Sequence, residues 1–425
     1  MWTFRTAAAA ALLAVTLPAC GTSPTSRALP AGGAEIAVAR PSVLLVSLDG
    51  FRPDYLGTGI TPNLDRLAER GVRAEWMVPS YPSLTFPNHY TIVTGMRPDR
   101  HGIVHNTIHD PSRGEDFTLQ NREAVADGRW WGGEPIWVGA EKAGLPTATM
   151  FWPGSEAEIA GVRPTRWMPF DDKLPIDARV DTVLGWLAEP AATRPRFATL
   201  YFEHLDKASH ANGPHSPEAH AAVAGLDRAI GRLMASLCGS EPVNILIVSD
   251  HGMAPTEPGQ GVALEDMVLP TDATAITYGQ AVGFEPLPGR IAAAEKALLG
   301  AHEHYDCWRK DAVPARWRFG LHPRVPAIVC QMHEGWGARP REALARHVPT
   351  GTRGSHGYDP ALQSMRSLFI ANGPAFVPST VLPAFDNIDV YPLLAHLIGI
   401  EPAANDGSIR SLAPALREPP ATQAP

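Results

Sequence analysis

Continuous apolar stretches of strand length recur along the chain, separated by segments with helical signals. A run of four to eight apolar residues bounded by polar or turn residues is typical of a strand that is buried on both faces, as in a parallel sheet. We predict such strands at 42–48, 147–152, 197–202, 243–248 and 367–371.

Helical segments alternate with these strands. Thr61-Pro62 opens a helix that we expect to end at Gly71, Ser216-Pro217 opens one that runs to about Leu237, and a last helix covers 388–398. Proline in a first turn and glycine after a last turn are common helix boundaries. The alternation predicts an α/β fold with a mostly parallel central sheet and helices on both faces.

The pattern changes between about 260 and 345. A short helix (290–299) and a strand (327–330) lie there among many Pro, Arg and Trp residues, so we predict a smaller inserted α+β subdomain. Cys307 and Cys330 flank part of it and are the favoured disulfide pair. Residues 111–135 are polar and rich in Trp and Gly, and they predict a surface excursion.

Both ends of the chain have a composition unlike the middle. Residues 1–20 predict a signal peptide that ends in Leu-Pro-Ala-Cys20 and resembles a bacterial lipoprotein signal, with acylated Cys20 as a membrane tether. An ordinary signal peptide is the alternative. Either implies an exported protein of the periplasm or cell envelope. Residues 21–40 predict a tether, 41–411 the main domain and 412–425 a flexible tail.

Composition and charge narrow the class of protein. The chain has 425 residues, of which 44% are hydrophobic and 19% charged, so it predicts a globular protein with a large core. The formal net charge of −8 argues against a large nucleic-acid surface, which would be basic. Small phosphorylated ligands remain compatible with it, because bound metal ions can reverse the local charge.

Acidic residues and histidines follow several of the predicted strands. Asp49, Asp206 and Asp250 would meet at the carboxyl edge of the sheet, where ligands of α/β proteins bind. His251 is adjacent to Asp250, and His210 lies four residues after Asp206. His356 stands between glycines. Carboxylate and imidazole ligands suit zinc, although each residue taken singly also fits a structural role.

Thr85 lies just before Pro87 and a mixed apolar run, at the expected start of a helix. Free N–H groups and the dipole at a helix start favour an anion, so the hydroxyl could attack phosphorus there. The alternative from the pattern alone is a plain helix N-cap.

Taken together and in order, these motifs resemble the nucleotide pyrophosphatase/phosphodiesterase family of the alkaline phosphatase superfamily. The resemblance covers roughly 40–400. It rests on 48–56 (Leu-Asp-Gly-Phe-Arg-Pro-Asp-Tyr-Leu), 61–64 (Thr-Pro-Asn-Leu), 85–90 (Thr-Phe-Pro-Asn-His-Tyr), 93–95 (Val-Thr-Gly), 101–103 (His-Gly-Ile), Asn106, Asp206 with His210, 213–214 (Gly-Pro), 249–253 (Ser-Asp-His-Gly-Met) and 354–357 (Gly-Ser-His-Gly).

The resemblance implies an alkaline-phosphatase-like fold and two zinc ions. One ion would be held by Asp206, His210 and His356, and the other by Asp49, Asp250, His251 and the Thr85 oxygen. Asn106 would bind a phosphate oxygen. The family usually has Asp-Ser-Ser-Gly-His where this chain has Asp-Lys-Ala-Ser-His at 206–210, so Lys207 and Ser209 are departures.

The implied activity is hydrolysis of nucleotide phosphodiesters or pyrophosphates to nucleoside monophosphates through a phosphothreonine at Thr85. Alternatives are hydrolysis of another phosphorus ester or phosphonate, including lipid head-group diesters, or a non-catalytic, zinc-binding surface lipoprotein. Phe86, Tyr201 and Phe170 are candidate walls of a slot for the base, and core packing is the alternative for Phe86 and Tyr201.

Overall fold

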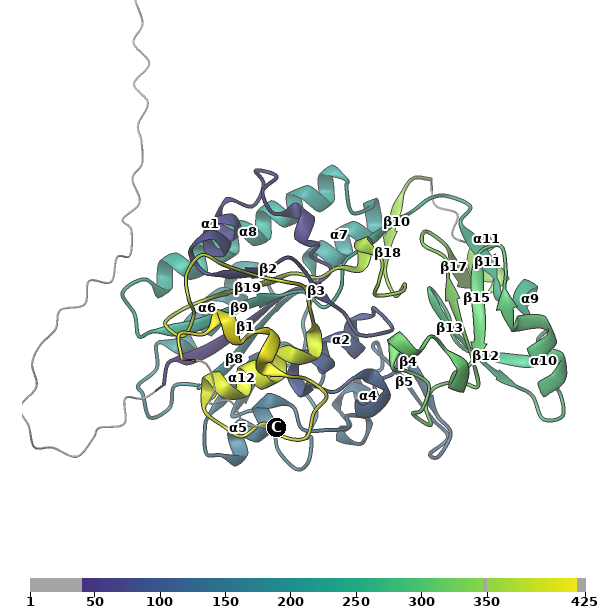
Figure 1. Cartoon of the computed structure of the whole chain (residues 1–425), viewed down its shortest axis with the longest axis horizontal. Helices are drawn as coiled ribbons and strands as arrows, with labels where there is room; N and C mark the ends of the chain where they lie inside the picture. The colour runs from purple at the N-terminus through teal and green to yellow at the C-terminus, as the bar shows by residue number, and fades with distance from the viewer. Residues whose placement is uncertain (1–39, 347–349, 419–425) are drawn as a thin grey trace, which may run out of the picture.

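A computed structural model describes residues 40–346 and 350–418, and it is organised around an eight-stranded sheet (Figure 1). Five neighbouring strands are parallel, and β19 is antiparallel to both of its neighbours. The strands, in sheet order, are β20 (Thr380–Leu382), β2 (Val72–Ala74), β19 (Phe369–Asn372), β9 (Val243–Val248), β1 (Ser42–Leu48), β8 (Phe197–Phe202), β6 (Thr147–Met150) and β7 (Arg166–Trp167). The predicted mostly parallel central sheet is confirmed.

Strand β1 lies in the middle of this sheet and is buried on both faces. Its alternate residues enter two different cores, Val43 and Leu45 on one side and Leu44 and Val46 on the other, and all four are fully buried. This two-residue alternation is the normal geometry of a strand between two layers of helices.

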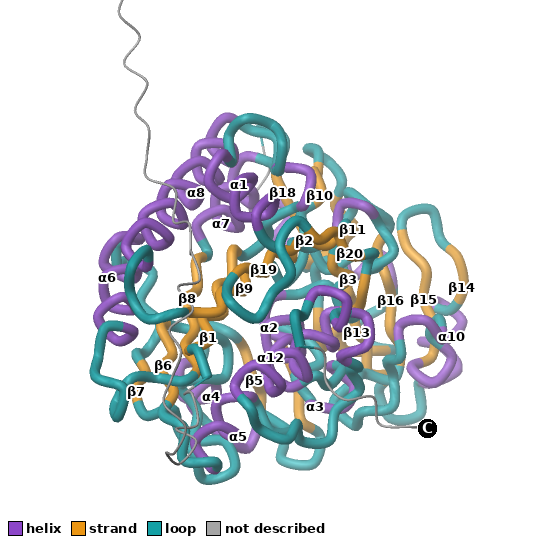
Figure 2. The backbone as a smooth tube through the Cα atoms, turned by 60° about the vertical axis from the view of Figure 1, so that its left-hand side comes forward, coloured by secondary structure: helices purple, strands orange, loops and turns teal. Residues whose placement is uncertain are grey.

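Helices cover both faces of the sheet, as Figures 1 and 2 show. On one face pack α1 (Pro62–Arg70), α6 (Ile176–Leu187) and α8 (Pro217–Leu237), and on the other α2 (Thr85–Thr94), α5 (Ile136–Lys142) and α12 (Val390–Ile398). The predicted starts of α1 and α8 are correct, since Pro62 and Pro217 occupy their first turns.

A second sheet with its own core lies to the right in Figure 1. Its antiparallel order is β12 (Ala273–Thr277), β13 (Ala281–Pro286), β16 (Ile328–Met332), β15 (Tyr305–Arg309) and β14 (Gly300–Ala301). Helices α9 (Leu264–Met267), α10 (Ile291–Leu298) and α11 (Arg341–Arg346) and the pair β11 (Gly261–Ala263) and β17 (Gly337–Arg339) accompany it. This is the predicted α+β insertion, and Cys307 and Cys330 form a disulfide between β15 and β16.

Shorter elements complete the described chain. They are β3 (Met77–Val78), α3 (Pro98–His101), β4 (Thr107–Asp110), β5 (Glu115–Thr118), α4 (Arg122–Ala126), α7 (His204–Asn212), β10 (Ala254–Thr256), β18 (Arg353–Ser355) and β21 (Phe385–Asp386). Within residues 40–346 and 350–418, no helix combines the length and apolar character needed to span a membrane.

Two sequence-based expectations differ from the structure. The Trp-rich segment 111–135 is not a surface excursion throughout, because Trp130 and Trp131 are buried in the main core. The predicted tail does not begin at 412, because Leu412 and Leu416 are also buried. The predicted signal peptide, Cys20 and nearly all of the tether lie outside the described residues.

Candidate metal and phosphoryl-transfer site

The candidate ligands lie where neighbouring strands end. Asp49 follows β1, Asp250 follows β9, and Asp206 lies in the first turn of α7, just after β8. Gly50 takes a left-handed φ of +71°, and a Cβ there would lie 3.4 Å from Asp206 Oδ1. The turn after β1 thus passes closely beside Asp206, and the three carboxylates gather at one edge of the sheet.

Two clusters of potential metal ligands result, Asp206 with His210 and His356, and Asp49 with Asp250 and His251. In each cluster the ligand atoms all lie within 4.8 Å of one another. The clusters are adjacent, because the rings of His251 and His356 stack with centroids 3.6 Å apart. The structure thereby brings together all six Asp and His residues that the sequence singled out.

Unpaired carboxylate oxygens show that these clusters fit cations. Asp49 Oδ1, Asp206 Oδ1 and Asp250 Oδ2 are buried without a hydrogen-bond partner, and histidine ring nitrogens lie 2.9 to 3.6 Å from them. A buried polar atom without a partner costs free energy, and a carboxylate costs more than a neutral group. Divalent cations bound between these oxygens would remove that cost.

The histidines present one nitrogen to the clusters. In each histidine, Nδ1 lies close to a backbone carbonyl oxygen. The distances are 2.8 Å from His210 Nδ1 to Gly354 O, 2.8 Å from His251 Nδ1 to Gly252 O and 3.0 Å from His356 Nδ1 to Ser83 O. A carbonyl can only accept, so each Nδ1 carries a proton. Nε2 is then left as the atom that can coordinate a metal.

The electrostatics of the site reflect crowded carboxylates. Burial raises the pKa of Asp49 well above its usual range, and the nearby Asp250 and Asp206 carboxylates raise it further. Burial alone would lower the pKa of His251, but the Asp250 and Asp206 carboxylates and the hydrogen bond to Gly252 together raise it. A locally negative, desolvated pocket of this kind attracts cations.

Thr85 begins helix α2 as its first helical residue, and Leu84 occupies the N-cap position without a side-chain capping bond. The plain N-cap alternative for Thr85 is therefore wrong. Its hydroxyl instead faces the metal-ligand cluster, with Oγ1 3.3 Å from His251 Nε2. The next N–H of the helix, from Phe86, donates to Asn106 Oδ1 at 3.0 Å, which places Asn106 beside Thr85.

Two further residues that support the helix start escaped the sequence analysis. Asn88 Nδ2 donates to the carbonyls of Pro82 and Leu84, each at 2.9 Å, and so fixes the loop before Thr85. His89 is fully buried, and its Nδ1 lies 2.9 Å from Thr85 O and 3.3 Å from Asp250 Oδ2. Both residues belong to the Thr-Phe-Pro-Asn-His-Tyr motif at 85–90, and their place beside Thr85 in that motif could have indicated a supporting role.

Comparison with known proteins identifies the family. The model of the type I phosphodiesterase/nucleotide pyrophosphatase family matches residues 43–359. The chain belongs to this family. It is 36% identical over 397 residues to an uncharacterized pyrophosphatase/phosphodiesterase of Schizosaccharomyces pombe, covering 89% of this chain and 81% of that one. It is 34% identical to mouse ectonucleotide pyrophosphatase/phosphodiesterase family member 1, covering 89% of this chain but only 43% of the mouse protein.

Solved structures of the family have the same fold. Human ectonucleotide pyrophosphatase/phosphodiesterase 5 superposes with a TM-score of 0.83 at 31% identity, covering 89% of this chain and 100% of that one. An inactive variant of the murine protein in complex with AMP gives a TM-score of 0.83 at 30% identity, with the same coverage. The predicted alkaline-phosphatase-like fold is confirmed.

The three aromatic residues predicted to contact a base have different environments in this family member. Phe170 is 36% exposed. Phe86 is partly buried against Phe117 and Trp131, with ring centroids 5.9 Å away in each case. Tyr201 is buried, and its hydroxyl donates to Asp49 Oδ2 at 2.6 Å, so its position favours support of the carboxylate over contact with a base.

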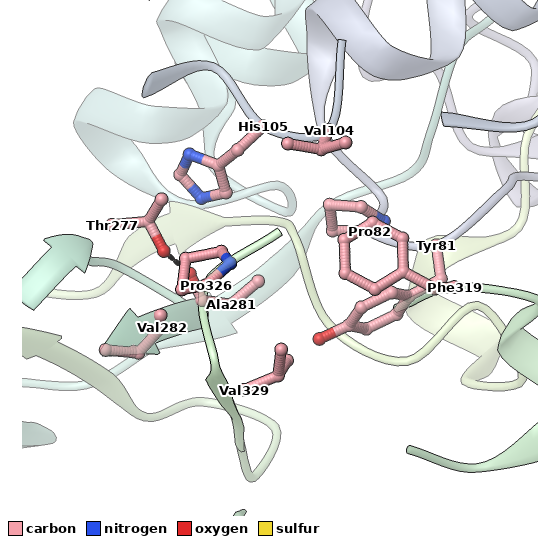
Figure 3. Close-up of a pocket in the computed structure, with 11 residues that line it drawn as sticks. Tyr81, Pro82, Val104, His105, Thr277, Ala281, Val282, Phe319, Pro326 and Val329 are labelled. Carbon is pink, nitrogen blue, oxygen red and sulfur yellow. Dashed lines mark hydrogen bonds between the residues drawn. The ribbon is translucent and has the colours of Figure 1, made fainter. Parts of the chain in front are cut away.

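A separate apolar cavity lies between the second sheet and the loops that precede α2 and β4 (Figure 3). Tyr81 and Phe319 lie on one side, Thr277, Ala281 and Val282 on another, and His105 faces them. Burial lowers the pKa of His105 to about 4, so this histidine is neutral at pH 7. The cavity contains no member of the two metal-ligand clusters, and we assign it to the junction of the two units.

Proposed function

We propose that this protein is a di-zinc phosphodiesterase that hydrolyses nucleotide phosphodiesters or pyrophosphates to nucleoside monophosphates. The observation that carries the proposal is the position of the Thr85 hydroxyl at the start of α2, beside two clusters in which each carboxylate has one buried oxygen without a hydrogen-bond partner. Family membership supports the reaction class.

Seven residues would hold the two ions. Asp206, His210 and His356 supply one set of ligands, and Asp49, Asp250, His251 and the Thr85 oxygen supply the other. Zinc bound there would act as a Lewis acid toward hydroxyl and phosphoryl oxygens, the chemistry that two-metal sites provide for displacement at phosphorus.

The proposed hydrolysis has two steps, in which Thr85 and Asn106 take part directly. Thr85 Oγ1 forms a bond to phosphorus as the bond from phosphorus to the leaving oxygen breaks, and the proton of the Thr85 hydroxyl ends on that leaving oxygen. Water then supplies its hydroxyl to phosphorus and its other proton to Thr85 Oγ1 as the bond from Oγ1 to phosphorus breaks, and the nucleoside monophosphate leaves. Because Asn106 Oδ1 accepts from Phe86 N–H, its Nδ2 is the free donor for a phosphoryl oxygen.

The charge of the site favours a diester over a monoester. Two divalent ions and three aspartates leave one net positive charge, which suits a phosphodiester monoanion better than a monoester dianion. Lys207 could have supplied more positive charge, but its Nζ lies 2.8 Å from Asp172 Oδ2 and 3.6 Å from Glu203 Oε1. These carboxylates compensate its charge.

A nucleoside would be retained beside Phe86 and Phe170. Phe170 presents an exposed ring, and stacking of a base on an aromatic side chain contributes roughly 1–3 kcal/mol. The murine relative that was solved with AMP supports a nucleotide as the ligand class. Export to the periplasm or cell envelope, with acylated Cys20 as the membrane tether, belongs to the same proposal.

Turnover of p-nitrophenyl-TMP by the metal-loaded protein tests this function. We expect Thr85→Ala to lower kcat at least a thousandfold, on the order of the loss of a nucleophile in other covalent mechanisms. Thr85→Ser is the matched control that keeps a hydroxyl, and it should retain measurable activity. Turnover that survived both removal of the metals and Thr85→Ala would refute the proposal.

A further inference from the structure

Arg179 of α6 is a fully buried arginine whose guanidinium binds three different parts of the chain. It makes a two-bond ion pair with Glu203, with Nη1 2.6 Å from Oε2 and Nη2 3.1 Å from Oε1. Nη1 also donates to Tyr201 O at 3.0 Å, at the end of β8. The planar guanidinium fork, which lysine lacks, allows these bonds to form together.

The same guanidinium holds the segment after Phe170. Its Nε donates to Leu174 O at 3.0 Å, and Nη2 donates to Asp171 O at 3.4 Å. Arg179 also lies over the ring of Phe151, 4.9 Å from its centroid. The rings of Phe170 and Phe151 pack edge to face, with centroids 5.2 Å apart. Arg179 thus fixes both the backbone beside Phe170 and one of the rings against which Phe170 packs.

Phe170 is also linked to the metal-ligand cluster. Its ring lies 6.0 Å from that of Tyr201, and the Tyr201 hydroxyl donates to Asp49 Oδ2. Glu203, the partner of Arg179, immediately precedes α7, the helix that carries Asp206 and His210. The Arg179–Glu203 pair therefore connects the segment that follows the exposed ring with the residue that precedes the helix of Asp206 and His210.

We propose that the buried Arg179–Glu203 pair is a positioning device that sets Phe170 at a fixed distance from the reacting phosphorus and thereby confers preference for esters that carry a nucleobase. This inference rests on the proposed function, and it adds the residues that determine specificity. Neither residue touches the substrate.

The Lys207–Asp172 pair beside the same segment is an unsuitable alternative. Each of its side chains is 52% exposed, and exposed ion pairs are worth only about 0–1 kcal/mol. Breaking a buried pair has larger consequences, because the remaining partner loses its compensation. The position of Phe170 therefore depends on Arg179 more than on Lys207.

Arg179→Lys tests the inference, because lysine keeps a charge beside Glu203 but cannot bind both carbonyls of the Phe170 segment. The measured quantity is the ratio of kcat/KM for p-nitrophenyl-TMP to that for methyl p-nitrophenyl phosphate, which retains only a methyl group. We expect the ratio to fall about tenfold, mainly through KM for the nucleotide ester, while turnover of the methyl ester stays within about twofold.

A double-mutant cycle separates positioning from general damage. Phe170→Ala should lower the ratio to a similar extent, and Arg179→Lys should lower it no further in that background. Arg179→Met/Glu203→Gln removes both buried charges and should behave as Arg179→Lys does. Asp181→Asn is the control, since Asp181 lies on the same helix but pairs with the surface residue Arg232, and its ratio should not change.

An unchanged ratio in Arg179→Lys and in Arg179→Met/Glu203→Gln, with an active parent, would overturn this inference and leave the proposed function standing. A further fall in the Phe170→Ala background would also overturn it, since Arg179 would then act by another route. A metal-loaded parent protein that hydrolyses neither ester would overturn the proposed function, and the inference with it.

Discussion

His210 and His356 face each other through the nitrogens that are left without protons. Their Nε2 atoms lie 3.1 Å apart, and both Nδ1 atoms are committed to backbone carbonyls. Two lone pairs at this distance repel each other unless a proton or a cation lies between them. Burial and the neighbouring histidines His251 and His210 lower the pKa of His356 well below its usual range, which disfavours the proton. The pair is arranged for a cation.

Asn106 should matter for turnover more than for stability. We expect Asn106→Ala to lower kcat about 100- to 1,000-fold, the usual effect of removing one donor to developing charge. The measurement is steady-state hydrolysis of p-nitrophenyl-TMP. Asn121→Ala is the matched control, because Asn121 only caps α4. Equal kcat values for Asn106→Ala and the parent would contradict the role of Asn106.

His89 should affect metal affinity without being a ligand. Its Nδ1 faces two acceptors, Thr85 O and Asp250 Oδ2, and its Nε2 accepts from the Ser47 hydroxyl at 2.8 Å. Residues that orient a metal ligand typically contribute about 10- to 100-fold in metal affinity or activity. We therefore expect His89→Ala to raise the zinc concentration needed for half-maximal activity by about that factor.

His109→Ala is the control for this variant, because the His109 side chain on β4 is 41% exposed and pairs with Asp116 on β5. His89→Gln should recover part of the loss, since an amide can replace one of the hydrogen bonds. An unchanged zinc requirement in His89→Ala would show that Asp250 keeps its orientation without the imidazole.

The individual candidate metal ligands could be predicted from the sequence, whereas the residues that hold them and the substrate-facing segments in place could not. Asp49 and Asp250 directly follow apolar runs, so their place at the sheet edge follows from the pattern. The supports depend on distant partners: Asn88 meets Asn387, and Arg179 binds a segment and a strand at once. No local pattern reveals such contacts, because they form only when the chain is packed.

At the scale of elements, strands that consist of long apolar runs can be predicted from the sequence, whereas short strands at the edges of the sheet cannot. The predicted strands at 42–48, 197–202 and 243–248 match β1, β8 and β9, which are buried on both faces. In contrast, β7 has only two residues and β20 three, with no apolar run to mark them. Their pairing depends on the neighbouring strand, which tertiary structure supplies.

The start of α1 provides a stability prediction. Asp227 of α8 is buried and accepts the N–H groups of Asn63 at 3.0 Å and Leu64 at 2.8 Å, as well as Asn63 Nδ2 at 2.8 Å. Asp227→Ala would leave these donors without a partner, so we expect a loss of about 2–4 kcal/mol in the free energy of unfolding. Equilibrium unfolding in denaturant measures this change in the free energy of unfolding.

The activity of folded Asp227→Ala should equal that of the parent, because the Asp227 carboxylate binds Asn63 and Leu64 of α1 and contacts no candidate metal ligand in the described part of the chain. Asp177→Ala is the control for this variant. Asp177 is 75% exposed and pairs with Arg232 on the surface, so its loss should change the free energy of unfolding by no more than about 0.5 kcal/mol. A comparable loss in both variants would contradict the capping role of Asp227.

At the scale of the whole molecule, the inserted unit is bound firmly to the main domain. Arg324 reaches from it to donate to Asp110 Oδ2 at 2.9 Å, Gly102 O at 2.9 Å and Trp130 O at 2.7 Å. Gln331 of β16 donates to Gly357 O at 3.4 Å, next to His356. The second sheet therefore supports the loop that carries the candidate metal ligand His356.

Removing the metals should destabilise the whole protein. A ligand that binds only the folded state adds about 2.7 kcal/mol at a concentration a hundred times its Kd. We expect chelation to lower Tm by several degrees and added zinc to restore it, as followed by calorimetry. The zinc-dependent increase should shrink in His356→Ala and persist in His333→Ala, whose ring is exposed beside Asp306. A Tm that does not change when zinc is added would argue against a specific metal site.

The spacing of the ligands along the chain has a consequence for synthesis. Asp49 and Thr85 are made early, but His356 lies about three hundred residues after Asp49 in the sequence. A nascent chain cannot complete the cluster of Asp206, His210 and His356 until that histidine has been added. Contacts so distant in sequence form slowly. Under the proposed function, ion binding at both clusters requires a chain made at least as far as His356, and shorter products would carry Thr85 without the complete set of ligands.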